Sequence, residues 1–121
     1  LARSDALSAL DHADRALVVL QSLELPAIPI EIANRALRAE ALLALQRPVD
    51  ARSEVDLAIE RLRASNPGAG AKRVHLLMLL ARIERTAGDV EAARAAVVGA
   101  RSLGVPTQYL DQRTRDLLRT E

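Results

Sequence analysis

Apolar residues recur at steps of three and four along most of the chain, which is the spacing of one face of an α-helix. In the N-terminal part this face comprises Leu7, Leu10, Ala13, Leu17 and Leu20. The pair Ser4-Asp5 before it is a good N-terminal capping signal. Pro26 and Pro29 predict the end of this helix, since neither fits inside one. No stretch alternates with a period of two, so we predict no strands.

Short breaks divide the rest of the chain into further helices. A second helix is predicted from Pro29, which suits a first helical turn, to about Gln46. A third follows the break at residues 47–50. The loop at residues 65–70 contains one proline and two glycines, and it precedes a fourth helix over about 71–87.

Two residues, Gly88 and Asp89, predict the end of the fourth helix and the cap of a fifth, which ends near residues 103–104. A sixth helix is predicted to start at Thr107 and to contain Tyr109, Leu110, Leu117 and Leu118. Six helices joined by short breaks predict an all-α protein, built as a stack of antiparallel helices.

Small and apolar residues repeat along the chain with a long and constant period. The three copies are Ala9, Ala13, Ala16 and Leu20; Ala51, Val55, Ala58 and Leu62; and Ala93, Val97, Ala100 and Gly104. The turns before these helices repeat in phase, because Gln46-Arg47 lies one period after Ser4-Asp5 and one period before Gly88-Asp89. Alanine at a helix crossing lets two backbones approach closely. A period of about 42 residues therefore predicts an array of repeated helix pairs.

In these residues the chain resembles the tetratricopeptide repeat (TPR) family. The matching positions are Ala81, Gly88-Asp89, Ala93, Val97 and Ala100 in one repeat, and Ala39, Leu45-Gln46-Arg47, Ala51, Val55 and Ala58 in the other. The resemblance implies a short right-handed α-solenoid of antiparallel helix pairs. Residues 4–24 would be the second helix of a partial repeat, 29–65 and 70–104 two repeats, and 106–119 a C-terminal capping helix.

The chain departs from the family pattern in three respects. Its period is longer than the usual one, which is about 34 residues. Gln46 stands where a glycine is usual, and Leu42 and Glu84 replace bulky aromatic residues. Long-period variants of this kind are similar to those in large bacterial signalling and transcription regulators. Armadillo or HEAT repeats have a similar period and are the structural alternative.

Composition and charge exclude several classes of function. The 121 residues contain no cysteine, so there is neither a disulfide framework nor a thiolate metal site. We expect a cytoplasmic location; the absence of cysteine is compatible with it but does not identify a compartment. Seventeen basic residues against sixteen acidic ones give no electrostatic footprint for nucleic acid. No apolar run approaches the length of a membrane span. Because the chain starts without methionine, we expect it to be part of a longer protein.

No residues combine into a catalytic, cofactor or metal site. Ser8 lies one helical turn before His12, but no oxyanion hole or third orienting group accompanies them. The second histidine, His75, is distant in sequence, and neither a HExxH motif nor a phosphate-binding glycine loop is present. We therefore expect the protein not to be an enzyme and to use no cofactor.

The resemblance implies a concave groove lined by the first helix of each pair. It would be formed by His75, Met78, Arg82 and Arg85 on one helix and by Ala33, Ala36, Glu40 and Leu43 on its neighbour. Arginines bind carboxylates through paired donors, so an acidic or C-terminal carboxylate partner is expected. The Lys/Asn pattern of the chaperone-binding carboxylate clamp is absent. Alternatively, Arg82 and Arg85 are ordinary solvated residues and Met78 belongs to the core.

Three classes of function follow from the sequence. The first is a non-enzymatic module that binds a protein or peptide partner in this groove. The second is self-association as a homodimer through Leu7, Leu10 and Leu17 on the first helix. The third is RNA binding or catalysis. The balanced charge and the near absence of aromatic residues argue against RNA binding.

Overall fold

The computed structural model describes residues 2–21 and 28–120 and is all-helical in that part of the chain. Six α-helices and one 3-10 turn follow one another, and no strand occurs among the described residues. The elements are α1 (Arg3–Gln21), α2 (Ile28–Ala44), α3 (Pro48–Ser65), α4 (Gly70–Thr86), α5 (Val90–Ser102), η1 (Thr107–Tyr109) and α6 (Gln112–Thr120). The prediction of an all-α chain with six helices is confirmed.

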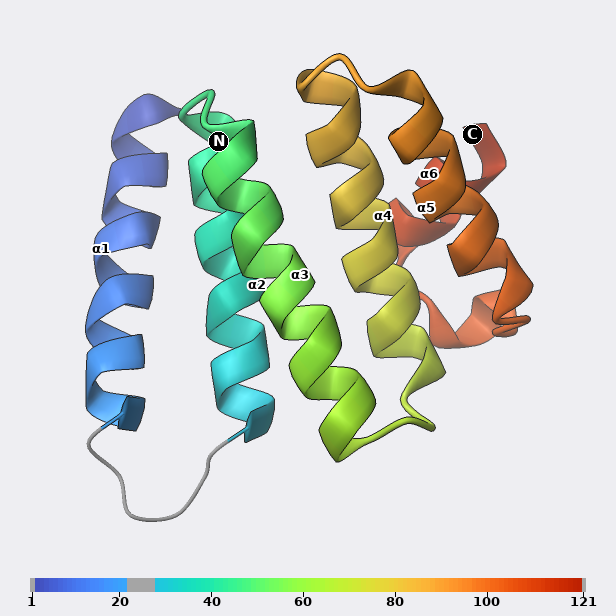
Figure 1. The fold of residues 1–121 in the computed structure, drawn as a ribbon, viewed down its shortest axis with the longest axis horizontal. Coiled ribbons are helices and arrows are strands. Elements are labelled where there is room, and N and C mark those ends of the chain that lie inside the picture. The colour runs from blue at the N-terminus through green and yellow to red at the C-terminus, as the bar shows by residue number, and fades with distance from the viewer. Residues whose placement is uncertain (1, 22–27, 121) are drawn as a thin grey trace.

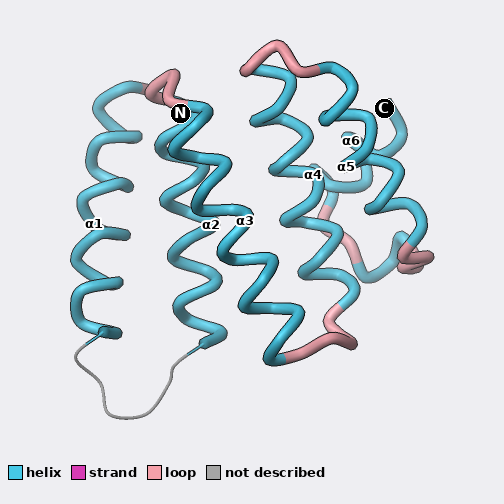
Figure 2. The backbone as a smooth tube through the Cα atoms, viewed as in Figure 1, coloured by secondary structure: helices cyan, strands magenta, loops and turns pink. Residues whose placement is uncertain are grey.

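Five of the helices stand side by side and alternate in direction, as Figure 1 shows from α1 in blue to α5 in orange. The tube view shows how tight the connections are between α2 and α3 and between α4 and α5 (Figure 2). The last helix, α6, lies behind α4 and α5 in both views. It contacts α4, so the end of the chain returns to the middle of the helical row.

The long period of the sequence recurs in the helix boundaries. The helices α2, α4 and α6 begin at Ile28, Gly70 and Gln112, and each start follows the previous one by the period of the sequence repeat. The second helices, α3 and α5, begin at Pro48 and Val90 with the same separation. The repeated pattern of small residues therefore coincides with repeated helix starts.

The two tight turns also share their hydrogen bonds. The amide of Arg47 donates to the carbonyl of Leu42 at 2.9 Å, and the amide of Asp89 donates to the carbonyl of Glu84 at the same distance. Each closes the end of a helix in the six-to-one pattern of a Schellman cap. At the start of α5 the predicted cap is confirmed, because the carboxylate of Asp89 accepts the amide of Ala92 at 3.0 Å.

Both ends of the chain differ from the prediction. Helix α1 begins at Arg3, so Ser4 and Asp5 lie within its first turn instead of capping it. Its buried face contains Ala6, Ala13 and Leu17, whereas Leu7 is 49% exposed. The predicted break at Pro26 falls in residues 22–27, outside the described part of the chain.

The sixth helix does not start at Thr107 as predicted. A 3-10 turn spans Thr107–Tyr109. The helix then begins at Gln112, because Asp111 acts as its cap and accepts the amide of Thr114 at 2.7 Å.

Three hydrophobic clusters form the core. They are Ala39, Leu42, Leu43, Ala51, Val55, Leu79 and Ile83; Val74, Met78, Ala81, Ala96, Val97, Ala100 and Leu110; and Ile32, Ala58, Leu62 and Leu76. Each cluster draws on two or more helices, so most of the buried face of each helix rests on its neighbours. Leu17 is buried and Leu10 packs against the first cluster, which leaves Leu7 as the exposed member of the proposed dimer face.

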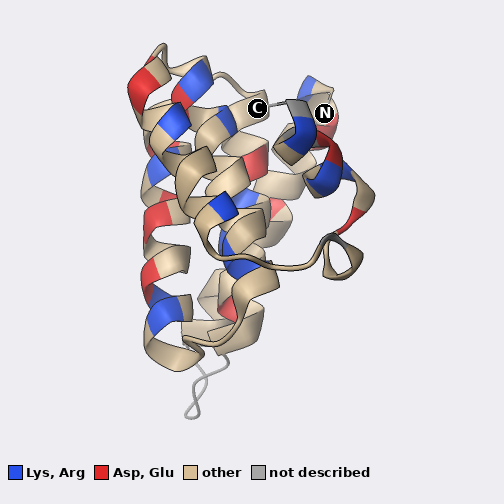
Figure 3. Ribbon diagram, turned by 90° about the vertical axis from the view of Figure 1, so that its right-hand side faces the viewer, with Lys and Arg blue, Asp and Glu red and all other residues tan. Residues whose placement is uncertain are grey.

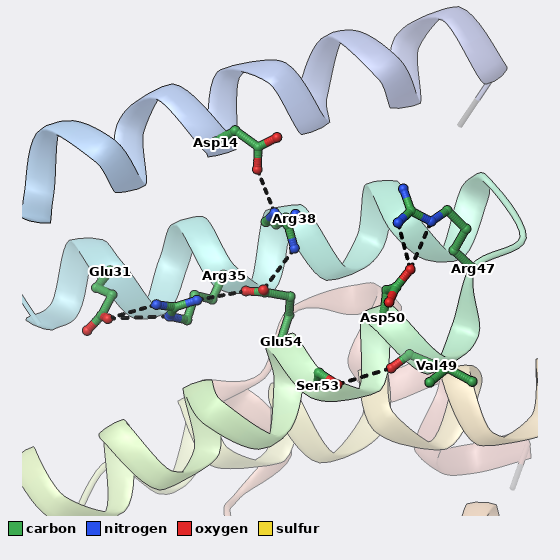
Figure 4. Close-up of polar contacts among 9 residues, drawn as sticks. All are labelled: Asp14, Glu31, Arg35, Arg38, Arg47, Val49, Asp50, Ser53 and Glu54. Carbon is green, nitrogen blue, oxygen red and sulfur yellow. Dashed lines mark hydrogen bonds and ion pairs between the residues drawn. The ribbon is translucent and has the colours of Figure 1, made fainter.

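Ion pairs between charged side chains link neighbouring helices. Glu84 is only 4% exposed and accepts both Nε and Nη2 of Arg52, the latter at 3.1 Å. A second network links the first three helices, in which Glu54 of α3 accepts Arg35 at 3.0 Å and Arg38 at 2.8 Å (Figure 4). Arg38 also donates to Asp14 of α1 at 2.6 Å. These pairs fix α1 and α3 against α2.

Charge is spread over the surface instead of being gathered in one region. Lys and Arg are interspersed with Asp and Glu along the helices in the side view (Figure 3). Among the described residues, no helix combines the length and the apolar character that crossing a membrane requires.

Candidate binding groove

A groove of about 490 Å³ lies on the side of the molecule where α2, α4 and the C-terminal segment meet. Its walls are Pro29, Ile32, Ala33, Ala36, Leu37 and Glu40 of α2, Ala71, Lys72, His75 and Leu76 of α4, and Tyr109, Leu110, Asp111 and Thr114. The end of α3 adds Leu62 and Ser65, and Asn66 follows it. A volume of this size is within the range of sites that hold a small molecule or a few residues of a peptide.

The floor of the groove is apolar. Ile32, Leu62 and Leu76 belong to the third core cluster and are buried. Beside them Ala33 and Ala36 have side chains too short to fill the space between α2 and α4. Leu37 remains 40% exposed on the same helix. The groove therefore offers an apolar surface that is recessed and yet open to solvent.

The C-terminal wall of the groove consists of Tyr109, Leu110, Asp111 and Thr114. It is held in place by Asp111 and by the close approach of the chain to Gly70. The hydrogen bond from the Thr114 amide holds the pKa of Asp111 below its usual range, with smaller contributions from the charges of His75 and Arg113. Nδ1 of His75 lies 4.0 Å from Oδ2 of Asp111, across the groove. A methyl group added at Gly70 would lie 2.8 Å from Cγ2 of Val105, so glycine allows the returning chain to pack on α4.

Of the eight residues predicted for the groove, four line it, namely Ala33, Ala36, Glu40 and His75. Arg82 lies in a small adjoining hollow that shares Glu40 and His75 with the groove. Leu43 is 8% exposed and belongs to the first core cluster. Met78 is 2% exposed and packs in the second cluster, with one edge on the small hollow, as the alternative interpretation had it. Arg85 is exposed and lies outside both hollows.

Sequence reasoning did not identify the C-terminal wall. It assigned residues 106–119 to a cap, whereas Tyr109, Asp111 and Thr114 line the groove and Arg113 lines the small hollow. The signal for this wall was available, because Gln112 follows Gly70 by one period and thus begins a helix equivalent to α2 and α4. Lys72 was also overlooked, although it lies one turn before His75 on the same face of α4.

The described residues do not form a cluster of His, Asp or Glu suited to a metal ion. Ser8 and His12 are both exposed on α1 and far from the groove, which agrees with a solvated helix face. No protein-family model matches the chain, and comparison with curated proteins and with solved structures also found no match.

Proposed function

We propose that the protein is a non-enzymatic interaction module that binds a peptide segment of a partner protein in the groove between α2, α4 and α6. The observation that supports this is the groove itself, whose floor of Ile32, Leu62 and Leu76 is apolar and whose rim contains Glu40, Lys72 and His75. Apolar recesses with a few convergent polar groups are the usual form of a binding site.

We infer further that the helices form a short right-handed solenoid of TPR-like repeats with a long period. The equal spacing of the starts of α2, α4 and α6 supports this, as do the matching hydrogen bonds of the turns at Arg47 and Asp89. In such an array the first helix of each pair would face the inner side. Ala33 of α2 and His75 of α4, which line the groove, lie on the two helices that would take this place. A module of this kind would belong to a larger bacterial signalling or regulatory protein.

Selection of peptides on a groove-blocked variant tests the proposal. A library of random decapeptides displayed on phage would be panned on the wild type and on Ala33→Trp, whose indole would occupy the recess. Ala33 is exposed within the groove, so the change should not disturb the core. Ala95→Trp is the matched control, because Ala95 is exposed on α5 and outside the groove.

We expect the wild type and Ala95→Trp to enrich the same peptides, with apolar residues at regular positions, and Ala33→Trp to lose them. Enrichment of these peptides on all three proteins would move the site elsewhere on the surface. Failure of the wild type to enrich any sequence would overturn the proposal of a peptide-binding groove.

A further inference from the structure

A second, smaller hollow of about 20 Å³ continues the groove along α4. It shares Glu40, His75 and Thr114 with the groove, and it is completed by Met78, Leu79, Arg82 and Arg113. A space of this size holds about one water-sized group, such as an oxygen atom of a carboxylate. The hollow is therefore too small for a separate ligand and suits the end of a group that already occupies the groove.

Two arginines face this hollow from different helices. Arg82 of α4 is half-buried, and Arg113 of α6 is exposed. Burial lowers the pKa of Arg82, and the positive charge of Arg113 lowers it further, while Glu40 acts in the opposite direction. Two cations thus repel one another at the end of the groove, and an anion between them would relieve that repulsion.

Neither arginine has a carboxylate partner of the kind that binds the arginines between the first four helices. Arg35 and Arg38 both bind Glu54, and Arg52 binds Glu84. Within the described residues, Arg82 and Arg113 have no carboxylate oxygen at ion-pair distance, although Glu40 lies near enough to affect Arg82. Guanidinium groups are suited to binding carboxylates through two parallel hydrogen bonds.

We propose that Arg82 and Arg113 together bind one carboxylate of the peptide that occupies the groove. The inference rests on the proposed function and adds to it the class of ligand and its direction. Lys72 and the apolar floor lie toward the start of α4, and the arginine pair lies toward its end. The bound segment therefore lies along α4 with its acidic group beyond His75.

Three synthetic peptides with the same apolar part provide the test. One is acetyl-Leu-Ala-Leu-Ala-Leu-amide, the second has a free C-terminal carboxylate, and the third is an amide extended by one aspartate. Their dissociation constants would be measured by NMR titration of the ¹⁵N-labelled wild type. Arg82→Gln, Arg113→Gln, Glu40→Gln and the control Arg94→Gln would be compared, since Arg94 is 73% exposed on α5 and outside both hollows.

We expect at least one carboxylate peptide to bind about tenfold more tightly than the neutral amide, as one charge-assisted contact provides. Arg82→Gln and Arg113→Gln should each remove this advantage, so that the variant binds the carboxylate peptides no more tightly than it binds the neutral amide. Glu40→Gln should increase the advantage, because a competing negative charge is lost. Arg94→Gln should behave as the wild type.

The two carboxylate peptides distinguish a C-terminal carboxylate from an aspartate side chain as the bound group. Equal affinity of the wild type for all three peptides would overturn the arginine site and leave the groove intact. Loss of peptide enrichment on Ala33→Trp in the phage selection remains the separate criterion for the groove itself. A carboxylate preference that persists in Arg82→Gln and Arg113→Gln would also contradict the inference.

Discussion

Gln46 and Gly88 occupy the same place in the turns between α2 and α3 and between α4 and α5, and both have left-handed backbone angles, with φ of 61° and 85°. Each donates its amide to the carbonyl three positions earlier, at 3.0 Å to Leu43 and 3.1 Å to Arg85. A residue with a Cβ atom is strained in this conformation, whereas glycine is not. The turn between α2 and α3 is thus strained at Gln46, whereas the similar turn between α4 and α5 is not.

Gln46→Gly should therefore raise the free energy of unfolding by about 1 kcal/mol, and Gly88→Ala should lower it by a similar amount. A Cβ atom at Gly88 would meet no atom within 4 Å, so the effect would come from the backbone and not from a clash. Urea denaturation measures both changes. Gly68→Ala is the control, because Gly68 has neither a left-handed φ nor a close neighbour, and it should change stability by less than about 0.5 kcal/mol.

The carboxylate of Glu54 forms ion pairs with Arg35 and Arg38, and the Glu54 side chain is 13% exposed. Glu54→Gln keeps the shape of the residue but leaves Arg35 and Arg38 without its charge. We expect a loss of about 1–3 kcal/mol in the free energy of unfolding, because partly buried donors lose an ionised acceptor. Asp11→Asn is the matched control. Its ion pair with Arg15 has side chains 76% and 56% exposed, so the loss should be below about 0.5 kcal/mol. Equal losses in the two variants would contradict this account.

The cap of α6 should depend on pH through Asp111. Its pKa is lowered in the folded protein, so its contribution to stability is present above the unfolded value of about 3.9 and is lost as the pH falls through the folded value. At neutral pH, Asp111→Ala should cost about 1 kcal/mol or less, since the side chain is 63% exposed. In acid, Asp111→Ala and the wild type should have the same free energy of unfolding.

Hydrogen exchange of the α6 amides, Thr114 in particular, would locate this effect. Asp111→Asn separates capping from charge, because asparagine caps a helix equally well and does not titrate. At neutral pH, Asp111→Asn should protect the α6 amides from exchange about as well as the wild type does. Unlike the wild type, it should keep this protection in acid. Protection that is unchanged in Asp111→Ala would show that the cap does not hold this helix.

Gly70→Ala should destabilise the protein although alanine favours a helix more than glycine does. The added methyl group would lie 2.8 Å from Val105, whose short branched side chain cannot move aside. Val105→Ala should remove the clash, so that the double variant is more stable than the sum of the single changes predicts, by at least about 0.5 kcal/mol. If thermal unfolding shows that the effects of the two single changes on stability simply add, the segment after α5 shifts to accept the methyl group without any loss of stability.

The helices were predictable from the sequence because the signals that define them are local. Pro48, Gly88 and Asp89 act within one turn of the chain, and the structure has a helix boundary at each of them. The start of the last helix was predicted too early, because its cap is Asp111, whose carboxylate accepts the amide of Thr114. The predicted face of α1 is correct at Ala13 and Leu17, which are buried, and wrong only at its start, where Ala6 is buried instead of Leu7.

The candidate groove was less predictable because it depends on which helices meet. The family resemblance placed Met78 and Leu43 on the groove side, but a helix in the middle of a row is covered on two sides, and both residues are in the core. Arg113 and Tyr109 were not recognised, because the signal for this wall is the long period that relates Gln112 to Gly70, and nothing near these residues in the sequence indicates it. Which residues line a groove depends on contacts between segments that are far apart in the sequence.

The chain contains one tyrosine and neither tryptophan nor phenylalanine. That residue, Tyr109, is 66% exposed and forms part of the groove wall. All of the aromatic near-ultraviolet absorbance and intrinsic fluorescence of the protein therefore originates at the candidate site. The emission of an unlabelled sample would report the arrival of any ligand that contacts this wall, with no background from the rest of the fold.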